Sequence, residues 1–220
     1  MLGLVVDGYL LGVLVSLPVG PVTITLIRRA LTLGFWNAVA FGGGSACADL
    51  FYIGLVYFGI APLLAELVWL RAALWGLGAL WLGWLGVDAI RSARRGIEFG
   101  AAQGADNGFS SYIAGVGVTL LNPLTIVGWI ALGGGFFSRH PETQMLGGGL
   151  LALLAMIAGT MSHVVVVSAV LATGRRWLSP RVVQGVSAAA GAILLLIAAS
   201  FLVSAVQGMI QGIPQPSAGS

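Results

Sequence analysis

The sequence predicts an all-α integral membrane protein that crosses the bilayer about six times. Of its 220 residues, 58% are hydrophobic and only 8% are charged, whereas soluble domains carry about 25% charged residues. The apolar residues also gather in runs of about 20 or more, the length that an α-helix needs to cross a bilayer. So few charges could not form a surface in water, and lipid is therefore the expected solvent.

Breaks in apolarity separate the runs and define the predicted spans. The strands of a β-barrel, the other structure that spans membranes, alternate in polarity over about 10 residues. The runs in this chain are longer and uniformly apolar, so helices are predicted. The predicted spans cover residues 4–27, 35–60, 67–90, 111–137, 145–173 and 182–206.

The basic residues, all of them arginines, indicate how the spans are oriented. Eight of the ten arginines lie after the first, third and fifth spans, on one face, and only Arg71 and Arg139 fall on the other. Cytoplasmic loops are enriched in basic residues, so this face is predicted to be cytoplasmic, with both termini outside the cytoplasm. Arginines between apolar spans form no basic surface in water, and no nucleic-acid partner is expected.

The chain divides into two predicted halves of three spans each. Residues 1–91 form the first repeat and residues 111–206 the second. The glycine-rich segment 92–110 is predicted to be a flexible cytoplasmic linker, and residues 207–220 a disordered tail. Three spans per half give the halves opposite orientations, which makes them inverted repeats of the kind found in many secondary transporters.

Prolines interrupt the first and fourth spans at corresponding places. Residues 18–21 read Pro-Val-Gly-Pro, residues 21–24 read Pro-Val-Thr-Ile and residues 123–126 read Pro-Leu-Thr-Ile. Proline breaks a helix but suits its first position, so a new helix is predicted to start at Pro21 and at Pro123. Unpartnered N–H groups at such starts attract carboxylates. A passive kink is the structural alternative for either motif.

Asn122 and Asp49 are polar residues within predicted spans. Asn122 is a favoured N-cap for the helix that follows it. Asp49 lies near the middle of the second span, where a carboxylate is costly unless it is paired, hydrated or protonated. It is therefore a candidate proton carrier or partner for a substrate ammonium. Ser45 and Tyr52 share its helix face.

The alternative for Asp49 is a structural ion pair with an arginine that follows the first span, Arg28 or Arg29. Arg28 is either a cytoplasmic anchor or, if the first helix continues to residue 33, a group inside the membrane. In the second case it is expected to pair with Asp49 or to bind a substrate carboxylate.

His163 in the fifth span is a further candidate, because imidazole exchanges protons near neutral pH. A neutral structural histidine is the alternative. His163 and Asp49 both lie in the middle span of their half, so we expect them to face one cavity.

Small residues and tryptophans have structural interpretations. Ala40, Gly44 and Ala48, and likewise Ser187 and Gly191, recur at four-residue spacing, which predicts close helix packing and would also allow a homodimer. Several tryptophans near span ends are expected to anchor at the lipid headgroups. The tryptophans considered are Trp69, Trp75, Trp81, Trp84, Trp129 and Trp177.

These motifs together resemble those of the LysE/RhtB family of exporters. Residues 18–21 are similar to the family's proline-glycine-proline signature, with Val19 inserted. Weaker similarities follow at Arg28 to Leu31 with Gly34, at Gly44 with Asp49, and at Asn122 with Pro123. The resemblance implies export of amino acids or similar small metabolites across the cytoplasmic (inner) membrane. It also implies coupling to an ion gradient, and a proton is the candidate ion.

The expected mechanism is alternating access of the two halves, with the substrate carboxylate at the helix breaks and Asp49 carrying a proton or cation. The residues expected to bind the substrate or the coupling ion are Pro18, Gly20, Pro21, Thr23, Arg28, Ser45, Asp49, Tyr52, Asn122, Pro123, Thr125 and His163.

Other functions fit the sequence less well. A metal exporter needs several buried carboxylates, imidazoles or thiolates, and the spans offer few beyond Asp49, His163 and Cys47. An enzyme is not expected, because the adjacent Ser162 and His163 point about 100° apart on a helix. No cofactor or bound metal is expected. Export of a metal cation or a lipid, and a non-transporting assembly subunit, remain the alternatives.

Overall fold

The structure is a computed structural model that describes residues 1–17, 20–60, 67–95 and 107–211. These ranges contain helices and no β-strand, which confirms the predicted all-α class. The elements are α1 (Leu2–Ser16), α2 (Pro21–Thr32), α3 (Phe35–Tyr57), α5 (Val68–Arg95), α6 (Gly108–Leu120), α7 (Pro123–Gly128), α8 (Gly134–Arg139), α9 (Leu146–Gly174) and α10 (Pro180–Gln211). A π-helical turn (Trp129–Gly133) joins α7 to α8, and 3-10 turns cover Pro141–Gln144 and Arg175–Trp177.

Four of these helices are long and apolar enough to cross a bilayer, and two bent pairs of helices pass the same test when each pair is taken together. Helices α3, α5, α9 and α10 pass this test singly. Helices α1 and α2 meet at 79°, and α6 meets the segment 124–139 at 65°. Counting each bent pair as one span gives six, the predicted number.

Both bends occur where the prolines predict them. Helix α2 begins at Pro21 after Gly20, whose backbone is extended at φ −126°. Helix α7 begins at Pro123 after Asn122. Proline has no N–H to leave unpaired at a helix start and clashes with a preceding helical turn, so each span ends and restarts there. Pro18 lies outside the described residues.

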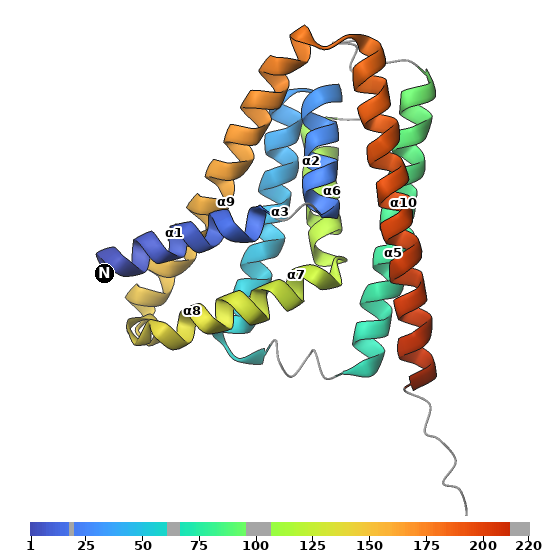
Figure 1. Cartoon of the computed structure of the whole chain (residues 1–220). Coiled ribbons are helices and arrows are strands. Elements are labelled where there is room, and N and C mark those ends of the chain that lie inside the picture. Colours follow the sequence, from blue (N-terminus) through green and yellow to red (C-terminus); the bar gives the residue numbers. More distant parts are fainter. Residues whose placement is uncertain (18–19, 61–66, 96–106, 212–220) are drawn as a thin grey trace, which may run out of the picture.

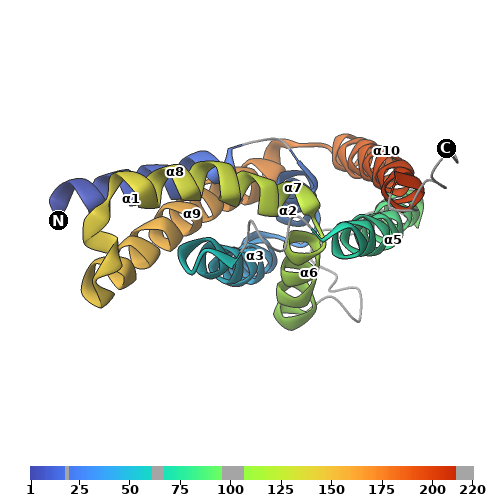
Figure 2. The ribbon, with the colours of Figure 1, turned by 90° about the horizontal axis from the view of Figure 1, so that it is seen from below.

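The helices pack in three long pairs (Figures 1 and 2). Helix α3 runs along α6, α1 along α9, and α5 along α10. The α5–α10 pair stands at one side of the molecule and contacts the other helices through α10 against α2 and through α5 against α6 and α7.

Glycines allow the backbones of these pairs to approach closely. A Cβ atom on Gly44 of α3 would collide with the carbonyl oxygen of Tyr112 in α6. A Cβ atom on Gly159 of α9 would likewise collide with the carbonyl oxygen of Tyr9 in α1. Gly191 of α10 similarly approaches the backbone of α5. The small-residue stripes therefore serve helix contacts within the chain.

The connections that carry most arginines lie at one end of the molecule. The end of α2, the end of α5 and the turn between α9 and α10 all lie at the top of Figure 1. This agrees with the prediction that these three connections share a face.

Helices extend further than predicted on both sides of the linker. Helix α5 continues to Arg95, and α6 already begins at Gly108, because the side chain of Asn107 accepts a hydrogen bond from the Ser110 N–H at 2.8 Å. Helix α10 likewise runs to Gln211, into the predicted tail. The rest of the predicted linker and tail, residues 96–106 and 212–220, lies outside the described residues.

Candidate functional site

A cavity of about 260 Å³ lies where the two helix breaks meet α3 and α9. It is slightly smaller than the pockets that hold drug-sized ligands, which measure about 300–1,000 Å³. Eight of the predicted site residues line this one cavity. They are Gly20, Pro21, Thr23, Ser45, Asp49, Asn122, Thr125 and His163.

Asp49 is the buried acid of the cavity, with only 6% of its surface exposed. The indole Nε1 of Trp129 donates a hydrogen bond to its Oδ1 at 2.9 Å. The described residues provide no further hydrogen-bond partner for Asp49. One hydrogen bond leaves most of the capacity of a carboxylate unused, and Asp49 is therefore available to a ligand in the cavity.

Trp129, the hydrogen-bond partner of Asp49, is a functional neighbour that was not among the predicted site residues. Its side chain is fully buried and lies in the π-helical turn after α7, so it is not one of the tryptophans that could anchor at the lipid headgroups. Such turns often occur at functional sites. Trp129 follows Thr125 by four residues, and this helical spacing was the signal for its place on the cavity side of the span.

His163 presents a ring nitrogen that has no partner. Its Nδ1 atom is buried and makes no hydrogen bond within the described part of the chain. Buried polar atoms are nearly always hydrogen-bonded in folded proteins. The Nδ1 atom has almost no exposed surface, so a ligand in the cavity would meet the ring of His163 rather than this nitrogen.

The hydroxyl groups of the cavity wall are already engaged. Ser45 Oγ and Thr119 Oγ1 lie 2.7 Å apart and share a hydrogen bond between α3 and α6. Thr160 Oγ1 donates to the Gly12 carbonyl at 3.2 Å. Thr119 and Thr160 were not predicted, because a threonine within an apolar helix also satisfies itself locally and gives no distinct sequence signal.

The two helix starts at the cavity differ in how they are capped. Asn122 Oδ1 accepts the Leu124 N–H at 3.2 Å, which confirms the predicted N-cap of α7, and its Nδ2 donates to Thr125 Oγ1 at 3.0 Å. Helix α2 has no side-chain cap, since Gly20 at that position has no side chain. The start of α2 is therefore the one that lacks an acceptor from its own cap.

Arg28 lies away from the cavity, and its predicted pairing with Asp49 is wrong. Helix α2 does continue to Thr32, so Arg28 is buried. This turn of α2 faces α5 and α10, however, and Arg28 Nη2 bonds Asp88 Oδ2 at 3.0 Å while its Nε donates to Ser187 Oγ at 3.2 Å. The alternative pairing of Asp49 with Arg29 is wrong too, because Arg29 Nη1 donates to Ser111 Oγ.

Two more predicted site residues have other positions in the structure. The hydroxyl of Tyr52 donates to the Leu120 carbonyl at 2.6 Å, and its buried ring packs in the core beside the cavity. Pro123 defines where α7 begins.

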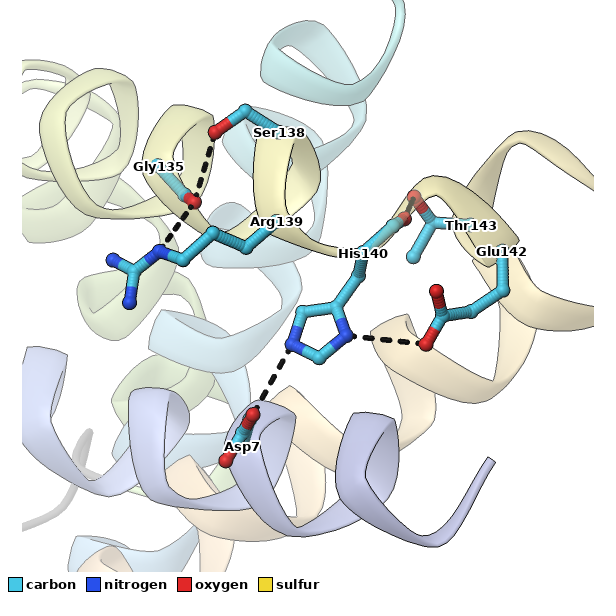
Figure 3. Close-up of polar contacts among 7 residues, drawn as sticks. All are labelled: Asp7, Gly135, Ser138, Arg139, His140, Glu142 and Thr143. Carbon is cyan, nitrogen blue, oxygen red and sulfur yellow. Dashed lines mark hydrogen bonds and ion pairs between the residues drawn. The ribbon is translucent and has the colours of Figure 1, made fainter.

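A second polar cluster lies outside the cavity, where α1 meets the turn after α8 (Figure 3). The ring of His140 bridges two carboxylates, with its Nε2 3.2 Å from Asp7 Oδ2 and its Nδ1 3.2 Å from Glu142 Oε1. Thr143 Oγ1 donates to the His140 carbonyl. Hydrogen bonds from its own backbone N–H and from His140 lower the pKa of Glu142 below its ordinary value.

Comparison with known proteins adds a family and several relatives. The family model described as LysE type translocator matches residues 13–205. The Bacillus subtilis (strain 168) protein named "Putative amino acid efflux protein YcgF" is 26% identical over 186 residues, 84% of this chain and 88% of that protein. The Aeromonas salmonicida protein named "Putative amino-acid transporter YggA" is 31% identical over 214 residues, which is 90% of this chain and 95% of that one.

A third relative carries a different kind of name. The "Chemotactic transduction protein ChpE" of Pseudomonas aeruginosa is 34% identical over 134 residues, 60% of this chain and 64% of that protein. No solved structure matches the chain.

Proposed function

The chain belongs to the LysE type translocator family, and on that premise we propose that it is a secondary exporter of amino acids. It is a membrane transporter of a small-molecule substrate by family. In the proposed function, the protein exports amino acids across the cytoplasmic membrane. Export is coupled to a proton and proceeds by alternating access.

The observation that carries the proposal is the cavity that both helix breaks share with Asp49 and His163. An amino acid has an ammonium and a carboxylate on one carbon, so its site needs an anion and hydrogen-bond donors close together. Asp49 supplies the anion. The start of α2, which has no side-chain cap, supplies a position for the carboxylate.

Proton coupling would follow from two uses of Asp49. A buried carboxylate in a membrane is tolerated when it is protonated or paired with a cation. Protonation of Asp49 would remove the charge that holds the substrate ammonium. Competition between the proton and the ammonium at one carboxylate then exchanges a proton for an amino acid in each cycle.

Alternating access would use the two predicted inverted repeats. Two parallels support this arrangement. Helix α1, before the first break, packs on α9, the middle helix of the second half, and α6 packs on α3 in the converse way. Each contact also contains a glycine at which an added Cβ would collide with the opposite backbone. These glycines are Gly159 in one contact and Gly44 in the other. Movement of one half against the other would open the cavity to either side in turn.

A non-transporting subunit is the second candidate, because the relative ChpE is named for chemotactic transduction. Such a subunit would not need an acid in a ligand-sized cavity. Metal export receives no such support, because no group of three or more His, Cys, Asp or Glu side chains among the described residues is placed to hold a metal ion.

The proposal is tested by efflux from cells loaded with radiolabelled amino acids through dipeptide uptake. Cells with the wild-type protein should export at least one amino acid. At equal abundance in the membrane, Asp49→Asn should lower this export rate at least tenfold. Empty-vector cells provide the background. A rate equal to that background for every amino acid would contradict export and favour the subunit.

A further inference from the structure

The charges of the cavity limit which amino acids it can hold. Asp49 and His163 are the only ionisable side chains among the described residues that line it. Arg28 and Arg29, the nearest arginines in sequence to the first break, are bonded to Asp88 and Ser111 elsewhere. The cavity therefore offers one anion for one ammonium, and no arginine for a second carboxylate.

A charged substrate side chain would lack a partner in this site. The ammonium of lysine or the guanidinium of arginine would need a second acid besides Asp49, and the side chain of glutamate would need a cation. Burying a charge without a partner is strongly unfavourable, because the charge loses its hydration. The site thus disfavours both basic and acidic amino acids.

The rest of the wall matches an apolar side chain. Six aliphatic residues contribute to it, while the hydroxyls of Ser45, Thr119 and Thr160 already bond to each other or to backbone. Burial of aliphatic surface stabilises binding by about 25 cal/mol per Å². The six residues are Val15, Val22, Leu26, Leu124, Leu132 and Val164.

We infer that the substrate is a zwitterionic amino acid with an uncharged aliphatic side chain, such as valine or leucine. The inference rests on the proposed export function and names its substrate class. Asp49 holds the ammonium, the start of α2 holds the carboxylate, and the aliphatic wall receives the side chain. The cavity of about 260 Å³ holds one such molecule.

The test is counterflow of radiolabelled leucine in liposomes that contain the purified full-length protein. Unlabelled valine and leucine should compete at concentrations at least tenfold lower than lysine, arginine or glutamate. Equal competition by lysine or glutamate would overturn the inference and leave amino-acid export standing. Lack of counterflow with every amino acid, by protein that stays monodisperse, would instead overturn the proposed function.

A charge introduced into the aliphatic wall tests the same inference from the protein side. Leu124→Asp adds a second acid, so lysine counterflow should rise at least tenfold relative to leucine. Leu124→Asn has the shape of the aspartate variant without its charge, so its lysine counterflow should stay at the wild-type level. An unchanged ratio in Leu124→Asp, or the same change in both variants, would overturn the assignment.

A third variant keeps the inference testable if polar residues at position 124 prevent folding. Val22→Phe fills part of the cavity with an apolar group, so leucine counterflow should fall at least tenfold while alanine counterflow persists. Equal loss of both amino acids by folded protein would contradict an aliphatic site at this wall.

Discussion

Asn122 lines the cavity and also caps the start of α7. Its Oδ1 accepts the Leu124 N–H, and an N-cap of this kind contributes about 0.5–2 kcal/mol. We expect Asn122→Ala to lower the stability of the protein in detergent by that amount. Thermal unfolding followed by tryptophan fluorescence measures the loss.

Asn122→Ser is the matched control, because serine also caps helices and should retain most of the stability. An equal loss in both variants would show that the Leu124 N–H does not depend on the cap.

Glu142 is the residue for which the structure indicates a pH dependence. Its pKa is lowered in the folded protein, so its contribution to stability is present above its ordinary pKa of 4.5 and is lost as the pH falls through the lower, folded value. His140, Asp7 and the N-terminal ammonium also face this cluster. We expect the protection factors of the amides of residues 142–146, which correct for the slower intrinsic exchange in acid, to fall below about pH 4.5.

Glu142→Gln separates this contribution from that of Asp7. The fall in these protection factors from pH 7 to pH 3.5 should be smaller in the variant than in the wild type. The same pH response in both proteins would assign the effect to another group.

At the scale of helices, the α3–α6 contact depends on one face of α3. A Cβ at Gly44 collides with the backbone of α6, whereas one at the adjacent Gly43 meets no atom within 4 Å. Gly44→Val should therefore destabilise the protein by about 1–3 kcal/mol or more, because backbone cannot move aside as a side chain can. The abundance of monodisperse protein extracted from membranes reports the effect.

Gly43→Val is the control on the same helix, and its yield should stay near that of the wild type. If both variants fold equally well, α3 and α6 do not approach as closely as the structure places them.

The breaks between helices could be predicted from sequence, but the partners of polar side chains could not. Proline acts on its own backbone, so Pro21 and Pro123 marked the helix starts directly. The partners of Arg28 and Asp49 depend on how each helix is rotated against its neighbours. Helix α3 is apolar on nearly all sides, and its sequence gives little indication of that rotation.

For the whole molecule, the arginine distribution leads to a prediction of sidedness. With Cys47 replaced by serine, a cysteine at the exposed Gln144 should react with a membrane-impermeant maleimide in intact cells. A cysteine at the exposed Ser179 should react only after permeabilisation, because its connection lies at the arginine-rich end.

The reverse pattern would place the arginine-rich end outside the cell. Labelling of both positions from the same side would contradict the six spans, since α9 alone separates the two connections.

The long contact between α5 and α10 also has a consequence for how the protein is made. Helix α5 ends at Arg95 and α10 begins at Pro180, so the ribosome must add most of the second half before the two can meet. At about 5–20 residues per second this takes roughly 4–17 s. During that interval α5 is in the membrane without its partner, and the face that will pack on α10 is covered only by lipid or by the insertion machinery.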